Sequence, residues 1–210
     1  ELFPYLQERI AERRAHPGED FLSHLIGLQE SGKLTEPELA DYAAMLLEAS
    51  TDNTTHQIAN MLGIVLERPA TLRRLAADPA LIPRMVEESI RYRARMVVQD
   101  RITREPISID GVDVPAGCHV FVWTWAAHRD PRMCASPEVL DISSDEPRPT
   151  LNFGGGEYAC LGQHVARLEM AEVLRVLVER FPDASLARPV GWWHSGFTSG
   201  ASSLPVRLRG

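Results

Sequence analysis

The chain has few cysteines, a single lysine and no long apolar run. Its three cysteines, Cys118, Cys134 and Cys160, are odd in number and widely spaced, a pattern that indicates neither a disulfide framework nor a zinc site. No apolar stretch is long enough to span a bilayer. The net charge of −7 disfavours a general nucleic-acid binder and binding to an anionic membrane surface. We therefore expect a reducing, cytoplasmic setting, with neither nucleic acid nor membrane as a partner.

The remaining composition is that of an ordinary globular protein. Of the 210 residues, 44% are hydrophobic and 24% are charged, which allows one large core or two small ones. Because the sequence begins with Glu1 and not with Met, we expect it to be part of a longer chain.

The first half of the chain has the apolar spacing of helices. Thr35 and Glu38 form the pattern of a capping box, which predicts the start of a long helix that runs to residue 67. The predicted helices cover residues 2–15, 21–29 and 35–67, a segment that begins at Pro83, and Gln163–Arg180. On the last helix, one apolar face is expected to hold Leu161, Val165, Leu168, Val173, Leu177 and Phe181.

Strand patterns follow in the second half. ISIDGVDVPAG alternates around Asp110-Gly111, which predicts a hairpin. HVFVWTW, residues 119–125, predicts a further strand whose Phe121, Trp123 and Trp125 pack on one face. The polar, Pro-rich residues 135–151 predict an irregular meander, and the tail from Gly196 predicts one more hairpin.

A glycine-rich segment around Cys160 carries the strongest chemical signal. Residues 152–169 read NFGGGEYACLGQHVARLE, in which one cysteine stands directly before a predicted helix. Glycines let the backbone approach a flat partner closely, and a cysteine at a helix N-terminus is readily deprotonated. The segment therefore suits either a nucleophilic cysteine, with His164 as a candidate base, or a thiolate ligand to a metal.

The spacing of this segment resembles a known motif. Phe153, Gly154, Gly156, Cys160 and Gly162 follow the order Phe-Gly-x-Gly-x-x-x-Cys-x-Gly, which resembles the haem-binding loop of the cytochrome P-450 superfamily. Three further stretches occur in the family's order: Glu88 to Arg91 resembles its Glu-x-x-Arg signature, Arg101 its haem-propionate arginine, and HRDP at 128–131 its Asn-Arg-Asp-Pro turn.

The resemblance implies a mainly α fold with small β-sheets (α+β), incomplete at the N-terminus. It covers nearly the whole chain but corresponds to the C-terminal half of a family member of the soluble bacterial type. The implied parts of this single domain are a helical segment 1–95, a small β-sheet 96–125, a meander and Cys loop 126–159, a proximal helix 160–181 and a C-terminal hairpin 182–210.

The implied cofactor is haem b, with the Cys160 thiolate as the axial ligand to iron. The implied cofactor-binding residues are Arg101, Phe153, Gly154, Tyr158, Cys160 and Gly162. Tyr158 replaces a basic residue that many members direct at a propionate, so more of the anion binding is expected to fall to Arg101.

Glu88 and Arg91 lie three residues apart, so they can pair on one helix face. By resemblance the pair is structural and supports the meander together with an arginine. Val139 stands where that arginine commonly lies, and Arg129 is the candidate to replace it.

The long helix is polar at its centre, from Ser50 to Gln57. Family members tend to carry Ala-Gly-x-(Asp/Glu)-Thr here, and this chain aligns Ala49, Ser50, Thr51, Asp52 and Asn53 with it. Asp52 keeps the acid, but Asn53 replaces the hydroxyl, and an amide is a poor proton relay. The implied catalytic residues are Ser50, Asp52, Asn53 and Thr54. The positions implied for substrate contact are Ala49, Met96, Val97, Val98 and Phe197.

The implied activity is that of a monooxygenase that oxidises a small organic molecule of secondary metabolism, with a ferredoxin or flavodoxin as electron donor. Arg148 and Arg167 are the expected docking charges for this donor. Two alternatives stay open. One is a non-hydroxylating oxidation (phenol coupling, nitration or rearrangement), and the other is a catalytically silent relative that acts as a binding module.

Overall fold

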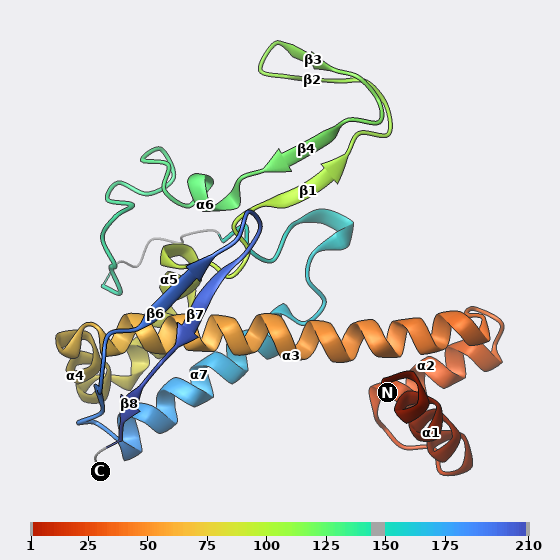
Figure 1. Ribbon diagram of the computed structural model, residues 1–210, viewed down its shortest axis with the longest axis horizontal. Helices are drawn as coiled ribbons and strands as arrows, with labels where there is room; N and C mark the ends of the chain where they lie inside the picture. The colour runs from red at the N-terminus through yellow and green to blue at the C-terminus, as the bar shows by residue number, and fades with distance from the viewer. Residues whose placement is uncertain (1, 144–149, 209–210) are drawn as a thin grey trace. The chain divides into compact units, whose positions relative to one another are not determined.

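A computed structural model describes residues 2–143 and 150–208. The chain forms two compact units, Glu1–Asn53 and Thr54–Gly210, and one long helix, α3 (Glu36–Leu66), contributes residues to both. Helices and small two-stranded sheets make up the elements, which confirms the predicted mainly α fold with small β-sheets (Figure 1). In the described residues, no helix is both long and apolar enough to cross a membrane.

The first unit consists of α1 (Leu2–Ala15), α2 (Phe21–Glu30) and the N-terminal part of α3. Both later helices begin at side-chain caps, as the sequence predicts for α3. The Asp20 carboxylate accepts from the Ser23 N–H at 2.9 Å, and the Glu38 carboxylate accepts from the Thr35 N–H at 2.7 Å. The small core of this unit contains Leu6, Ile10, Leu25, Ile26, Leu39 and Ala43.

The second unit has the larger core, formed where four helices meet. The C-terminal part of α3 packs with α4 (Pro69–Ala77), α5 (Ile82–Tyr92) and α7 (Gln163–Arg180). A short 3-10 turn, η1 (Pro79–Leu81), joins α4 to α5. The fully buried side chains here include Met61, Ile64, Leu75, Met85, Ile90, Met170 and Leu174.

Helix α7 buries only part of the predicted apolar face, its C-terminal residues Leu177 and Phe181. Its buried residues are Met170, Leu174, Leu177 and Val178, whereas Leu161, Val165 and Leu168 are 76%, 59% and 61% exposed. At 3.6 residues per turn the two sets lie on opposite sides of the helix. The sequence pattern does not distinguish the two apolar faces of this helix. In the packing of the second unit one face is buried and the other is exposed.

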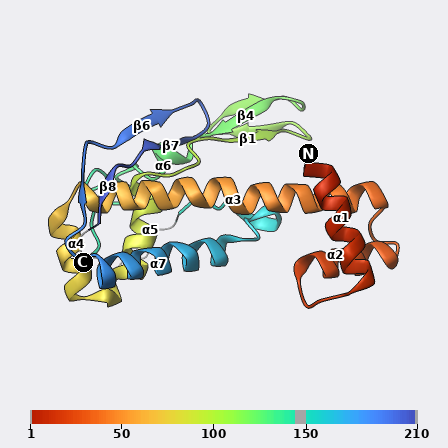
Figure 2. The same cartoon turned by 60° about the horizontal axis from the view of Figure 1, so that its bottom comes forward.

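Four two-stranded antiparallel sheets belong to the second unit. The pairs are β1 (Gln99–Ile102) with β4 (His119–Val122), β2 (Ile107–Ile109) with β3 (Val112–Val114), β5 (Ser185–Leu186) with β8 (Val206–Arg207), and β6 (Gly191–His194) with β7 (Ser199–Ser203). The predicted hairpin is confirmed, since Asp110 and Gly111 have φ of 50° and 79° at the β2–β3 turn. Figure 2 shows β6 and β7 on the side of the C-terminal half of α3 opposite α7.

Two strand predictions are wrong. The strand predicted to continue to residue 125 ends at Val122, because Trp123 is the N-cap of the short helix α6 (Thr124–Ala127). Phe121 and Trp123 are 57% and 60% exposed and do not pack as a core stripe. The tail from Gly196 does not pair with itself either, since β7 and β8 take partners from residues 185–194; the hairpin within 182–210 is formed by β6 and β7.

Candidate functional site

The segment from Leu151 to Gly162, here called the Cys loop, is held by its own backbone. The Gly154 N–H donates to the Leu151 carbonyl at 3.0 Å, and the Cys160 N–H donates to the Phe153 carbonyl at 2.8 Å. Gly154 and Gly156 both have φ of +69°, a left-handed conformation that residues other than glycine rarely adopt. A 3-10 turn, η2 (Gly156–Tyr158), leads to the cysteine. The hydrogen bond from the Cys160 N–H to the Phe153 carbonyl fixes the backbone of Cys160 just before α7.

The side chain of Cys160 is exposed, and there is room beside it. A Cβ built at Gly155, Gly156 or Gly162 would meet no described atom within 4 Å. Tyr158 is 81% exposed on the same loop. Within the described residues no hydrogen bond joins Cys160 to His164, which is exposed on the first turn of α7. The arrangement presents a sulfur ligand at a helix start and does not form a cysteine–histidine pair.

Arg101 is linked to the Cys loop through one intermediate residue. Its guanidinium donates to the Gln99 side-chain oxygen at 2.9 Å and to the Asp100 carbonyl at 2.8 Å. The Gln99 amide in turn donates to the Leu151 carbonyl at 2.8 Å. Gln99 was not predicted from the sequence, because a half-buried glutamine on a short strand carries no motif.

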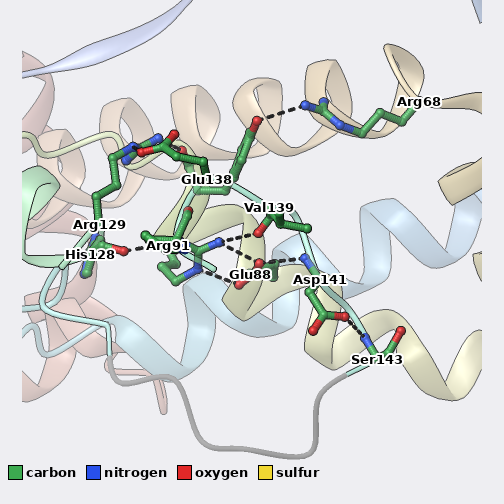
Figure 3. Close-up of polar contacts among 11 residues, drawn as sticks. Arg68, Glu88, Arg91, His128, Arg129, Glu138, Val139, Asp141 and Ser143 are labelled. Carbon is green, nitrogen blue, oxygen red and sulfur yellow. Dashed lines mark hydrogen bonds and ion pairs between the residues drawn. The ribbon is translucent and has the colours of Figure 1, made fainter. Parts of the chain in front are cut away.

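Glu88 and Arg91 form a buried ion pair with two bonds, at 2.8 Å from Nε to Oε2 and 2.7 Å from Nη2 to Oε1. Their side chains are 3% and 2% exposed. Arg91 also donates to three backbone carbonyls, those of His128 at 3.2 Å, Pro137 at 2.7 Å and Val139 at 2.9 Å. Figure 3 shows the pair at the centre of these contacts. The predicted pairing on one helix face is present, and it reaches into the meander.

Arg129 does not complete this pair. Its guanidinium donates to the Tyr92 carbonyl at 2.7 Å and lies 4.0 Å from the centroid of the Trp125 ring. At the position of Val139 the meander supplies a backbone carbonyl instead of an arginine. The Asp141 N–H donates to Glu88 Oε1 at 2.8 Å. Backbone groups therefore take the contacts that were expected from an arginine side chain (Figure 3).

The polar stretch of α3 is divided between the two units. Ser50, Asp52 and Asn53 belong to the first unit and are exposed, and the Ser50 hydroxyl donates to the Leu47 carbonyl at 3.1 Å. Thr54 begins the second unit and is half-buried. The helix runs through this stretch without a break.

The next polar residues of α3 have a structural role that the sequence analysis missed. The Gln57 amide nitrogen donates to the Arg93 carbonyl at 3.2 Å, and its oxygen accepts from the Arg95 N–H at 2.8 Å. The Asn60 amide donates to the same Arg93 carbonyl at 3.3 Å. Both side chains bind the backbone that leaves α5, and their spacing of three residues is the signal that could have paired them.

Four of the positions implied for substrate contact lie together. Met96 forms a β-bridge with Thr198, and the N–H groups of Val97 and Val98 donate to the Phe197 carbonyl at 2.8 and 3.4 Å. The Phe197 ring is 49% exposed. Ala49, the fifth position, belongs to the other unit.

Comparison with known proteins identifies the family. A family model described as cytochrome P-450 matches residues 2–183. The chain belongs to the cytochrome P-450 family. It is similar to luteothin monooxygenase of Streptomyces thioluteus, at 33% identity over 99% of this chain and 51% of that protein. It is also 37% identical to the biotin biosynthesis cytochrome P-450 of Bacillus subtilis, over 87% of this chain and 46% of the relative.

Solved structures agree with this assignment. A cytochrome P-450 of Bacillus megaterium in complex with testosterone superposes with a TM-score of 0.91 at 33% identity, over 99% of this chain and 58% of that one. The chain spans about half the length of the curated relatives that it matches. Cytochrome P-450 enzymes bind haem b through a cysteine thiolate.

The residues of the Cys loop fit this cofactor. Cys160 offers an exposed soft sulfur ligand at a helix N-terminus, and the glycines beside it leave open space where a flat macrocycle needs it. Arg101 is an exposed cation tied to the same loop through Gln99, which suits the carboxylates of a propionate-bearing ring.

Proposed function

We propose that the chain is the haem-bearing half of a monooxygenase in which Cys160 is the axial ligand of haem b. The observation that carries the proposal is the placement of Cys160, exposed at the start of α7 and fixed by the hydrogen bond from its N–H to Phe153. Bound haem supplies the redox chemistry of dioxygen activation. The overall reaction would place one oxygen atom of dioxygen in the substrate and release the other as water, with two electrons and two protons consumed.

The residues of this chain have separate roles in the proposal. Arg101 binds a propionate, while Phe153, Gly154, Tyr158 and Gly162 shape the loop around the ring. Asp52, with the hydroxyl groups of Ser50 and Thr54 and with ordered water, holds and moves protons, and Asn53 positions that water. The buried pair of Glu88 and Arg91 supports the meander and takes no part in the chemistry.

The proposed substrate is a small organic molecule of secondary metabolism, and the electron donor is a ferredoxin or flavodoxin. Two named relatives support this substrate class, luteothin monooxygenase and the nocardicin C N-oxygenase of Nocardia uniformis, which is 37% identical over 96% of this chain. Met96, Val97, Val98, Phe197 and Ala49 are the proposed contacts with the substrate. The cytoplasm is the proposed location.

A second candidate function has specific support. A solved cytochrome P-450 described as acting in C–S bond formation in chuangxinmycin biosynthesis superposes with a TM-score of 0.91 at 30% identity. Together with Asn53 in place of a hydroxyl residue, it favours a non-hydroxylating oxidation as the alternative. Mass analysis of the product separates the two, since hydroxylation adds one oxygen and coupling removes two hydrogens.

The spectrum of the reduced, carbonyl-treated full-length protein tests the haem assignment. We expect the long-wavelength Soret band of a thiolate-ligated haem in the wild type and its loss in Cys160→Ala. Cys118→Ala is the matched control, because Cys118 is half-buried directly before β4 and its backbone carbonyl accepts from the Thr103 N–H. A folded wild type without the band, or a Cys160→Ala variant that keeps it, overturns the proposal.

A further inference from the structure

His128 is a buried residue that the proposed chemistry does not use. It follows α6 and is 3% exposed. Its backbone carbonyl accepts from Arg91 at 3.2 Å, and its ring nitrogen Nε2 accepts from the Leu151 N–H at 2.8 Å. One residue therefore contacts the buried Glu88–Arg91 pair through its backbone and the Cys loop through its side chain.

The hydrogen bond to Leu151 determines the state of the ring. A backbone N–H can only donate, so Nε2 must hold a lone pair and the proton of the neutral imidazole is on Nδ1. In the described part of the chain this Nδ1 is buried and has no hydrogen-bond partner. Burial, with Arg91 and Arg129 nearby, lowers the pKa of His128 to about 4, which keeps the imidazole neutral.

The unpartnered Nδ1 argues against His128 as a simple filler of space. A buried donor without an acceptor is costly, and an apolar residue of similar size would avoid that cost. What an apolar residue would lack is the acceptor for Leu151. The Nε2 lone pair is therefore the property that a histidine contributes here.

Leu151 is the residue at which the Cys loop is anchored. Its carbonyl accepts from both Gln99 and Gly154, at 2.8 and 3.0 Å. If one of these donors is removed, the carbonyl keeps a hydrogen bond to the other. The Leu151 N–H donates to the Nε2 of His128. From Leu151 the loop continues to Phe153, whose carbonyl holds the N–H of Cys160. The least redundant of these bonds is the one made by His128.

We propose that His128 is a positioning residue, whose neutral imidazole anchors Leu151 and thereby couples the buried Glu88–Arg91 pair to the position of the Cys160 sulfur. This inference rests on the proposed haem function only for the identity of the ligand. The anchoring bond is a property of this chain and can be measured at the Leu151 amide itself.

The test compares His128→Leu with His128→Gln in the full-length holoprotein. Leucine has similar bulk and no acceptor, whereas the glutamine side-chain oxygen can replace Nε2 as the acceptor. Hydrogen exchange is followed at Leu151. We expect exchange about tenfold faster in His128→Leu, since a lost hydrogen bond is worth about one factor of ten, and restored protection in His128→Gln.

The same variants are then examined for the ligand. We expect the fraction of haem with the long-wavelength thiolate band to fall in His128→Leu and to recover in His128→Gln. Gln99→Leu is the matched control for the loop, because the Leu151 carbonyl keeps Gly154 as a donor. It should leave Leu151 exchange unchanged.

A further measurement covers the case in which His128→Leu fails to fold. In the diamagnetic, carbonyl-bound wild type, the nitrogen chemical shifts of His128 should show a protonated Nδ1 and an unprotonated Nε2. The opposite tautomer, unchanged Leu151 exchange in His128→Leu, or faster exchange with an unchanged thiolate band would each overturn the proposal. A wild type without haem would instead refute the proposed function, which separates the two failures.

Discussion

The guanidinium carbon of Arg167 lies 4.4 Å from the centroid of the Phe153 ring. The same guanidinium pairs with the Glu87 carboxylate and donates to the Gln163 side chain at 3.0 Å. Arg167 therefore connects α5 and α7 to the residue whose carbonyl holds Cys160. From the sequence, Arg167 is predicted to dock an electron donor together with Arg148, which lies outside the described residues. The structure places it in internal contacts.

We predict that Arg167→Met destabilises the fold by about 1 kcal/mol. It removes a cation–π contact and a partly exposed ion pair, each worth about 0.5–1 kcal/mol. Urea unfolding measures the change. Arg175→Met on the same helix is the control, since its pair with Glu172 is exposed, and it should shift stability by less than about 0.5 kcal/mol. Unaltered stability in Arg167→Met, with a weaker dependence of the reduction rate on salt, would support the docking role instead.

The buried Glu88–Arg91 pair should be the most sensitive site of the second unit. We predict that Arg91→Met costs about 3–5 kcal/mol, because it breaks a buried ion pair with Glu88 and removes the donor to three carbonyls. Urea unfolding of the full-length protein gives the value. Arg129→Met is the comparison and should cost less, because this half-buried arginine donates to the Tyr92 carbonyl and stacks on Trp125. A smaller loss for Arg91→Met than for Arg129→Met contradicts this ranking.

The lowered pKa of His128 predicts a defined loss of stability in acid. The imidazole titrates near 6.5 when unfolded and at about 4 when folded, so between these values the unfolded state binds the extra proton. The contribution is fully present above pH 6.5 and is lost as the pH falls toward 4. It amounts to at most about 3.5 kcal/mol at about 1.4 kcal/mol per pKa unit.

His128→Gln isolates this contribution, because every other group titrates in both proteins. Urea unfolding across this pH range should show the stability advantage of the wild type shrinking as the pH is lowered. A difference that stays constant with pH would mean that His128 is not the group responsible.

Two glycines in helices should respond oppositely to alanine. A Cβ at Gly63 of α3 would lie 2.7 Å from the Trp192 ring. That ring cannot easily move, since Arg93 lies 3.7 Å from its centroid and its N–H donates to Glu67 at 3.1 Å. We predict that Gly63→Ala lowers the free energy of unfolding by about 1–3 kcal/mol.

Gly27 of α2 is the matched control. A Cβ there would meet no described atom within 4 Å, so Gly27→Ala should gain up to about 1 kcal/mol from helix propensity. Thermal unfolding reports both variants. A stable Gly63→Ala protein would show that Trp192 repacks.

Asn53→Thr tests the proton path within the proposed function. A hydroxyl at this position should improve the relay, so peroxide released per electron should fall and product formation should rise, by up to on the order of 10²-fold. Asn53→Ala is the control that removes the amide without adding a hydroxyl. If threonine and alanine behave alike, residue 53 does not carry the proton relay.

Local patterns in the sequence were enough to predict several helix starts and turns of this protein. The capping box at Thr35, the turn at Asp110-Gly111 and the helix after Cys160 each depend on residues within a few positions of one another. The motif around Cys160 led to the family for the same reason, since all its members lie in one short loop.

Only the tertiary structure decided which of several possible partners each side chain takes. It selected one apolar face of α7 over the other, gave Arg167 to Glu87 and Phe153, and joined His128 to Leu151 across 23 positions of the chain. At Val139, where an arginine was expected, the backbone carbonyl accepts a hydrogen bond from Arg91. These choices depend on which surfaces meet in space, and helical or alternating periodicity specifies a face of an element but not the surface that covers it.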